Sequence, residues 1–395
     1  MPLLGELITA LEGWFDPRWA EPWDAVGLVC GDPDEPVSRV LLAVDAVPGT
    51  VAEAVDAGTQ LLITHHPLLL TAVHGVPADN PKGGLVHRMI RAGVAHYVAH
   101  TNADVASPGV SDALANRLGL VELRPLEPQA DEPLDKLVVF VPTANAEPLI
   151  DALAAAGAGR LGNYDRCAWS TEGTGTFRPQ SGANPTIGSL GDIERVVESR
   201  VEMVLPRRLR ADVIAAMRAA HPYEEPAFDL LAQARGPGSR GTGRVGQLPT
   251  TMTLAEFTAH AATVLPATAW GVRAAGNPAR EIRTVAVCGG SGGSLAEDAR
   301  RAGADVFLTA DLKHHPAVEA VTERGGDGMA LVDAAHWATE APWLDELAGA
   351  LEEHFGTTVD IRVSRQITDP WTLHIPSPAS PAPQESQPQG SQIST

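Results

Sequence analysis

Apolar runs alternate with helical segments along the first 120 residues of the chain. Residues 39–45, 60–64 and 95–99 are apolar enough to form buried strands. The segments between and after them have the spacing of helices, at 51–57, 84–91 and 111–118. Strands that alternate with helices predict an α/β layered domain. The first residues, MPLLGELITALEGW, form an amphipathic helical pattern.

The pattern changes near residue 121, where prolines among acidic residues predict a linker. Six further elements follow in the order strand, helix, strand, strand, helix, strand, at 136–141, 146–156, 165–176, 195–205, 208–220 and 227–231. This order is typical of the ferredoxin-like fold. A glycine-rich stretch, 236–246, closes the unit. We therefore predict that residues 130–235 are a ferredoxin-like α+β domain inserted into the α/β domain.

The α/β pattern resumes after the insertion. Strands are expected at 284–288, 305–308 and 329–332, and helices at 295–302, 317–324 and 339–355. From residue 375 the chain is rich in Pro, Ser and Gln, so it lacks the apolar surface needed to fold. The predicted organisation is a first half at 1–125, the insertion at 130–235, a second half at 245–374 and a disordered tail at 375–395.

An internal repeat links the two outer segments. Residues 51–67 (VAEAVDAGTQLLITHHP) and 295–316 (LAEDARRAGADVFLTADLKHHP) both contain a helix, an Ala-Gly turn, an apolar strand and His-His-Pro. Each half later offers a histidine four residues before an acid, in HTNAD at 100–104 and HWATE at 336–340. We expect two related α/β halves that together form one metal-binding domain.

Composition narrows the classes of function. The formal net charge of −20 argues against a nucleic-acid-binding protein, which needs clustered Lys and Arg. Three widely spaced cysteines give no disulfide framework, and the start of the chain lacks a signal-peptide pattern. No apolar run is long enough to span a membrane. These features favour a cytoplasmic protein that acts on a small molecule.

Two pairs of candidate metal ligands lie in the first half. His65 and His66 follow a predicted strand, and adjacent side chains diverge along an extended segment, so the two histidines suit two different metal ions. Alone, such a pair is as often two exposed loop residues. His100 and Asp104 lie on one side of the chain if the segment turns helically. Alone, Asp104 is more often a helix cap and His100 a buried, hydrogen-bonded residue.

The second half repeats this pattern. His336 and Glu340 span the start of a predicted helix, where Glu340 also suits the helix dipole. Imidazole with carboxylate is the ligand set for Zn, Mn, Fe or Co, and one carboxylate can bridge two cations. His314 and His315 are either further ligands or groups that bind substrate beside the metal ions. The recurrence in both halves favours a two-metal site.

Two other motifs each have two interpretations. The loop Gly289-Gly290-Ser291-Gly292-Gly293 either cradles a phosphate with its amides or forms a tight turn near the metal site, since it matches no clean nucleotide motif. The segment HPYEEP at 221–226 either binds a cation or, more often for a segment with proline on both sides, forms a rigid turn.

Five motifs together resemble the Nif-three-like family, also known as GTP cyclohydrolase I type 2 homologues. They are ITHHP at 63–67, HTNAD at 100–104, GGSGG at 289–293, ADLKHH at 310–315 and HWATE at 336–340. PWDAVGL at 22–28 is similar to the family's N-terminal signature, with Ala25 where Asn is usual. The insertion is similar to the PII/CutA-like module of longer bacterial members.

The resemblance implies a dinuclear site and a toroidal homohexamer. The implied ligands are His65, His66, Asp104, His336 and Glu340, with two divalent cations per subunit. His100 remains a candidate ligand or proton shuttle.

Two functions are open at this point. One is a metal-dependent hydrolase of the GTP cyclohydrolase type that acts on a purine nucleotide through a metal-activated water, with His100, His314 or His315 moving protons. A phosphoesterase would use the same metal ions. The other is a hexameric regulatory or scaffold protein in which metal ions join the two halves and no turnover occurs.

Overall fold

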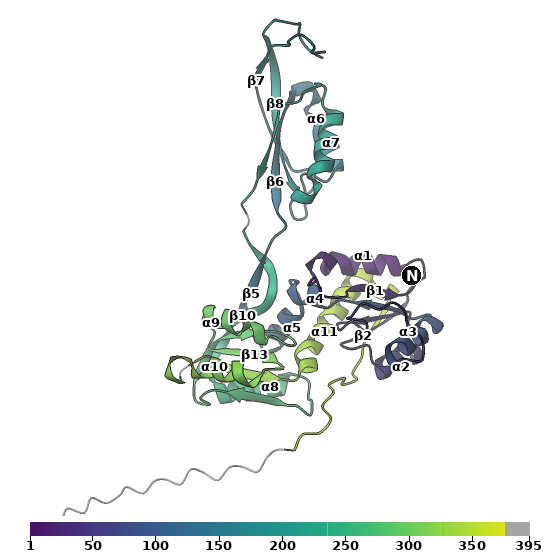
Figure 1. Ribbon diagram of the computed structural model, residues 1–395, viewed down its shortest axis with the longest axis vertical. Coiled ribbons are helices and arrows are strands. Elements are labelled where there is room, and N and C mark those ends of the chain that lie inside the picture. Colours follow the sequence, from purple (N-terminus) through teal and green to yellow (C-terminus); the bar gives the residue numbers. More distant parts are fainter. Residues whose placement is uncertain (235, 327, 376–395) are drawn as a thin grey trace, which may run out of the picture. The chain divides into compact units, whose positions relative to one another are not determined.

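The computed structural model describes residues 1–234, 236–326 and 328–375. The chain divides into two compact units (Figure 1). Residues 1–126 and those from 242 onward form the outer unit, and residues 127–241 form the inserted unit.

The first half of the outer unit contains a five-stranded sheet in the order β1-β4-β3-β2-β15. Its strands are β1 Gly27–Cys30, β2 Arg39–Ala43, β3 Leu61–Thr64, β4 Ala95–Val98 and β15 Asp360–Val363. All neighbours pair in parallel except β1, which runs antiparallel to β4. The central strands β3 and β4 are fully buried, because helices cover both faces of the sheet.

Helices pack on the two faces of this first sheet. Buried residues of α2 (Pro48–Asp56) and α3 (Pro81–Arg91) lie in one hydrophobic cluster. Buried residues of α1 (Leu4–Trp14) and of α11 (His336–Phe355) lie in another. Two short α-helices follow β4, namely α4 Thr101–Val105 and α5 Val110–Arg117.

The second half contains a six-stranded sheet in the order β11-β14-β13-β12-β10-β5. Its strands are β5 Val121–Ala130, β10 Pro237–Thr253, β11 Val272–Ala275, β12 Glu281–Val287, β13 Val306–Ala310 and β14 Ala330–Ala334. Strands β12, β13 and β14 are parallel, and β11 runs antiparallel to β14. The helices are α8 Leu254–Val264, α9 Ala296–Arg301 and α10 His314–Gly326.

The two halves share one topology. In each, three parallel strands stand in sequence order and a short antiparallel strand pairs with the third. The long helix α11 and the shorter α5 lie between the two sheets (Figure 1). The expected mixed α/β fold is therefore confirmed. None of the helices in the described part of the chain is long and apolar enough to cross a membrane.

The inserted unit has its own sheet and core. Strands β6 Leu134–Pro142, β7 Ala168–Phe177, β8 Glu194–Pro206 and β9 Phe228–Ala232 form an antiparallel sheet in the order β7-β8-β6-β9. Helices α6 Ala146–Ala155 and α7 Arg210–Ala220 lie on the same side of it (Figure 1). They bury residues such as Leu149, Leu153 and Met217 against the sheet.

The structure corrects two predictions at the ends of the insertion. The proline-containing segment expected to be a linker is strand β5, and residues 237–246 of the glycine-rich stretch belong to strand β10. A Cβ at Gly241 would lie 2.2 Å from the backbone oxygen of Glu127, so glycine permits a close approach of the two strands. The sequence patterns also missed β1, β11, β15 and α8. Of the tail predicted at 375–395, residues 376–395 lie outside the described residues.

A buried ion pair joins α5 to β10. The guanidinium of Arg244, which is 1% exposed, donates to both carboxylate oxygens of Asp112 over 2.7 and 2.6 Å. It also donates to the backbone oxygens of Ala106 and Gly243. Removing one partner of such a pair leaves an uncompensated buried charge.

We expect Arg244→Met to lower the free energy of unfolding by about 3–5 kcal/mol, because the buried carboxylate of Asp112 loses its partner. Chemical denaturation followed by circular dichroism measures this change. Arg362→Met is the matched control, since Arg362 pairs with Asp360 on the surface and should cost less than about 1 kcal/mol. Equal losses of unfolding free energy in the two variants would contradict the role of the buried Arg244–Asp112 pair in stability.

Candidate metal centre

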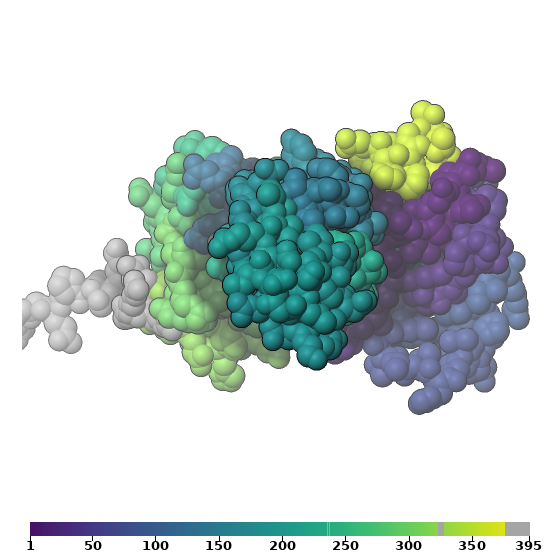
Figure 2. Space-filling model, turned by 90° about the horizontal axis from the view of Figure 1, so that it is seen from above, coloured from purple at the N-terminus to yellow at the C-terminus, as the bar shows by residue number. Residues whose placement is uncertain are grey.

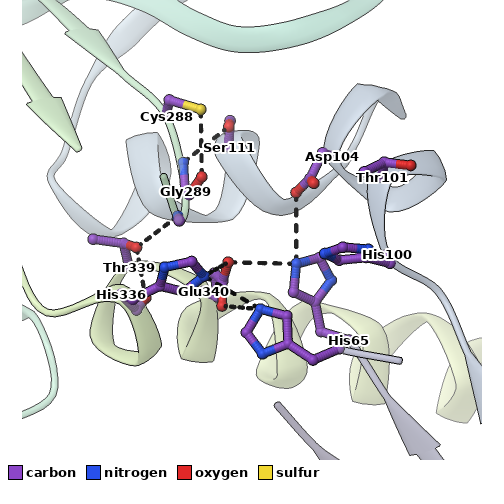
Figure 3. Close-up of polar contacts among 12 residues, drawn as sticks. His65, His100, Thr101, Asp104, Ser111, Cys288, Gly289, His336, Thr339 and Glu340 are labelled. Carbon is purple, nitrogen blue, oxygen red and sulfur yellow. Dashed lines mark hydrogen bonds and ion pairs between the residues drawn. The ribbon is translucent and has the colours of Figure 1, made fainter. Parts of the chain in front are cut away.

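The polar cluster lies where strands of both halves end. His65 and His66 directly follow β3, and His100 precedes α4, which carries Asp104. His336 and Glu340 occupy the first turns of α11, which follows β14. Carboxyl ends of parallel strands are where open α/β sheets place their sites. Side chains from both halves of the outer unit thus point toward one another (Figure 3).

Glu340 is the central residue of this cluster. Its Oε1 lies 3.0 Å from Nε2 of His336 and 3.5 Å from Nε2 of His65, and its Oε2 lies 3.1 Å from Nε2 of His66. The Nε2 atoms of His66 and His336 are 3.3 Å apart, although 270 positions separate the two residues. The structure therefore brings together residues from distant parts of the sequence.

Asp104 and His100 lie beside this group. Oδ1 of Asp104 is 3.7 Å from Nε2 of His65. The His100 ring lies 5.1 Å from the His65 ring and 5.5 Å from the His66 ring, measured between centroids. All five residues proposed from the sequence as ligands, and His100 with them, thus occupy one region.

Each histidine is held through its Nδ1 atom. His65 Nδ1 lies 2.9 Å from the backbone oxygen of Ala99. The other three face carboxylates, in the pairs His66–Asp45, His100–Asp24 and His336–Asp311, at 2.7, 2.8 and 2.7 Å. An acceptor at Nδ1 places the proton of the neutral ring there, so the neutral ring offers its Nε2 lone pair to a metal ion.

The three carboxylates that orient these rings were not identified from the sequence. Asp45 is the last residue of the predicted strand 39–45, Asp24 lies in the PWDAVGL motif and Asp311 lies in ADLKHH. Their motif positions were visible, but their pairing with particular histidines depends on the tertiary fold.

The donor atoms suit a cation. Nε2 of His65 is buried and has no hydrogen-bond partner, and the buried Oε2 of Glu340 faces Nε2 of His66 at 3.1 Å. Two sets of donor atoms each lie within 4.8 Å of one another, His65 with His66 and His100, and His66 with His336 and Glu340. Buried lone pairs that face each other without a proton or cation between them are costly. Imidazole and carboxylate are ligands for Zn, Mn, Fe or Co, so these residues fit a metal centre.

The charges of the cluster are strongly coupled. Burial alone would lower the pKa of His66, but the Glu340 and Asp45 carboxylates raise it to about 11. Burial likewise opposes the charged form of His336, and Glu340 and Asp311 raise its pKa to about 9. Burial opposes ionisation of Glu340, yet the surrounding histidines hold its pKa well below the usual range. Glu340 is therefore a carboxylate that attracts positive charge.

Asp104 behaves differently from Glu340. Burial raises its pKa, and His65 opposes that effect only in part. A cation placed among these residues would favour its ionised form.

The glycine loop is a tight turn against the cluster. Gly290 has a φ of +64°, and a Cβ there would lie 2.4 Å from Oε1 of Glu340. The amides of Gly289, Gly290 and Gly292 donate to the hydroxyls of Ser111, Thr339 and Thr309. Those amides are already used, which argues against the phosphate-cradle interpretation of this loop.

His314 and His315 lie apart from the contacts of the cluster. They begin α10, are exposed, and their rings pack on each other at 5.2 Å. Among the described residues, no hydrogen bond or ion pair joins them to the cluster. In the inserted unit, His221 uses Nε2 on the backbone oxygen of Phe140 and Nδ1 on the amide of Tyr223, which favours the rigid-turn interpretation of HPYEEP.

Comparison with known proteins identifies the family of this chain. The model for Duf34/NIF3 (NGG1p interacting factor 3) matches residues 2–370. The chain belongs to the DUF34/NIF3 family.

Relatives within the DUF34/NIF3 family match over almost their whole length. A GTP cyclohydrolase 1 type 2 homolog of Mycobacterium tuberculosis is 51% identical, and the match covers 94% of this chain and 97% of the relative. The homolog of Bacillus subtilis is 38% identical, with 93% and 98% covered. The crystal structure of a Bacillus cereus protein related to NIF3 superimposes with a TM-score of 0.77 at 37% identity, covering 94% of this chain and 99% of that one.

We expect Asp45→Ala to weaken zinc binding by this DUF34/NIF3 protein about 10–100-fold, because His66 loses the acceptor that orients its ring. Competition with a chromogenic chelator measures the affinity. Asp34→Ala, which removes an exposed carboxylate outside the cluster, is the control and should leave the affinity unchanged. Equal affinities for wild type and Asp45→Ala would contradict the orienting role of Asp45.

Metal binding should release protons, because the rings of both His66 and His336 are protonated on both nitrogens at pH 7 in the metal-free fold. A metal ion binds only the neutral ring, so zinc affinity should rise as pH rises from about 6 to 9. The metal-free fold should lose stability over the same rise, since a raised histidine pKa stabilises only the protonated state. Calorimetry in buffers with different ionisation enthalpies counts the released protons. A proton count of zero at pH 7 would contradict this prediction.

Proposed function

We propose that this DUF34/NIF3 protein is a dinuclear-metal-dependent hydrolase. The observation that carries the proposal is the convergence of His65, His66, Asp104, His336 and Glu340, with the buried Nε2 of His65 lacking a hydrogen-bond partner. Two divalent cations held there would supply Lewis acidity and the activation of water near neutral pH.

The roles of the protein side chains follow from their contacts. Glu340, which faces three imidazoles, is the residue best placed to be shared by two cations. Burial opposes ionisation of Asp24, but hydrogen bonds from His100 and Thr101 hold its pKa well below the usual range. Asp24 therefore stays charged and fixes the His100 ring, which suits His100 as the group that moves a proton.

The substrate class comes from the relatives. Their name, GTP cyclohydrolase 1 type 2 homolog, supports a purine nucleotide as substrate. The family resemblance also supports a homohexamer in the cytoplasm. The order of elements in the inserted unit, with sheet order β7-β8-β6-β9 and both helices on one side, supports a ferredoxin-like domain there.

A second candidate function is regulatory binding without turnover. The inserted unit has its own cavity of about 600 Å³, a size typical of small-molecule sites. Its lining includes Phe140, Arg200, Glu198 and Tyr223. In this alternative, the cavity binds a small ligand and the metal ions join the two halves of the outer unit.

We expect His65→Ala and Glu340→Gln each to reduce the metal content from about two ions per chain to below one. Each should also reduce kcat/KM for GTP or bis(p-nitrophenyl) phosphate by at least about a hundredfold. Elemental analysis and initial rates measure the two effects. His74→Ala, an exposed histidine outside the cluster, should leave both unchanged.

Two outcomes would count against the hydrolase. Turnover that survives both substitutions would come from a contaminating enzyme. Full metal content without turnover of either substrate, for every metal tried, would favour the regulatory alternative.

A further inference from the structure

A cavity of the outer unit opens beside the metal centre. Its volume is about 280 Å³, and its lining includes His66 and His336 at the metal centre and Trp270, Asp369 and Trp371 elsewhere. Small-molecule sites usually measure about 300–1,000 Å³, so this cavity suits one ring system rather than a whole nucleotide.

Two buried polar atoms of the cavity lining have no hydrogen-bond partner. They are Oδ2 of Asp369, a residue that is 7% exposed, and Nε1 of Trp270. An unsatisfied buried polar group destabilises the structure that contains it. A ligand that brings an N–H group to Asp369 and a hydrogen-bond acceptor to Trp270 would remove this cost.

Trp371 adds a flat apolar surface. It is 59% exposed, and its ring centroid lies 5.6 Å from that of Trp270 with the planes tilted by 41°. An exposed tryptophan beside a cavity is a surface on which a planar ring can stack.

The charge of the cavity argues against a phosphate group. Its lining contains the carboxylates of Asp45, Asp311 and Asp369 and no Lys or Arg. Both oxygens of Asp45 already accept hydrogen bonds, from His66 and Thr368, and Oδ2 of Asp311 accepts from His336, whereas Oδ2 of Asp369 has no partner. A phosphate anion placed here would meet negative charge, whereas a neutral ring with an N–H group would not.

The segment that carries Asp369 is fixed to the first half of the outer unit. Ser364 and Gln366 donate to Glu53 over 2.6 and 2.8 Å, and Thr368 donates to Asp45. In the space-filling view, this C-terminal segment, in yellow, lies against the purple N-terminal region (Figure 2). Asp369 is thus held in place before any ligand binds.

We infer that this cavity binds a planar nitrogen heterocycle, with a ring N–H donating to Asp369, a ring acceptor receiving from Trp270 and one face on Trp371. The inference deepens the proposed hydrolase, because it assigns recognition of the substrate's ring to residues beside the metal centre. It makes Asp369, Trp270 and Trp371 specificity residues, distinct from the proposed metal ligands.

The test uses full-length protein with its metal content measured, and inosine as the probe. Inosine offers a ring N–H next to a carbonyl and has no phosphate. 1-Methylinosine carries a methyl group in place of that hydrogen and is otherwise the same molecule, and ribose 5-phosphate has the phosphate without the base. Calorimetry and quenching of tryptophan fluorescence report binding without requiring turnover.

Inosine should bind at least tenfold more tightly than 1-methylinosine or ribose 5-phosphate. Asp369→Asn and Trp371→Ala should each weaken inosine binding at least tenfold, with metal content unchanged. Trp169→Ala, which removes a tryptophan of similar exposure in the inserted unit, is the matched control and should bind inosine like the wild type.

Three results would overturn the inference: no binding of inosine to the wild type, equal binding of 1-methylinosine, or unchanged binding by both Asp369→Asn and Trp371→Ala. The fate of the hydrolase proposal is separable from this one. Selective inosine binding without turnover of any nucleotide would leave the ring site standing and refute the hydrolase. Turnover of a phosphodiester without inosine binding would support the hydrolase and refute the ring site.

Discussion

A buried carboxylate facing several imidazoles is the interaction on which the outer unit depends. Glu340 is 3% exposed, and burying a charge is expensive unless partners compensate it. Its partners His65 and His66 directly follow β3 in one sheet. The third partner, His336, lies on the same helix as Glu340, which follows β14 in the other sheet. The position of α11 between the two sheets is therefore fixed by electrostatics as well as by its apolar face.

The neighbouring loop is shaped by the same requirement. Gly290 must lack a side chain because Oε1 of Glu340 occupies that space. The hydroxyl of Thr339 accepts a hydrogen bond from the amide of Gly290. Each of the four histidine rings is oriented by its own acceptor at Nδ1. The centre is thus preorganised by a layer of carboxylates and backbone oxygens around the donor atoms.

The sequence allowed prediction of the parallel strands and of the residues that gather at their ends, because buried strands give uninterrupted apolar runs and their carboxyl ends share an edge. The acceptors of the histidines were not predictable, since Asp24 and His100 are 76 positions apart and meet only in the fold. Strand β5 was missed because its prolines suggest a linker, although they are tolerated in a strand at the end of the sheet order. The unpaired atoms of Trp270 and Asp369 likewise depend on a tertiary contact that no local pattern records.

The order in which the donor groups are synthesised follows from their positions on the chain. A nascent polypeptide acquires His65, His66 and Asp104 early, but the carboxylate of Glu340 and the imidazole of His336 appear only with α11. Until that helix leaves the ribosome, the first half carries His65, His66 and Asp104 without the Glu340 carboxylate that faces the imidazoles in the finished fold. A complete centre therefore signals that translation has passed through nearly the entire outer unit.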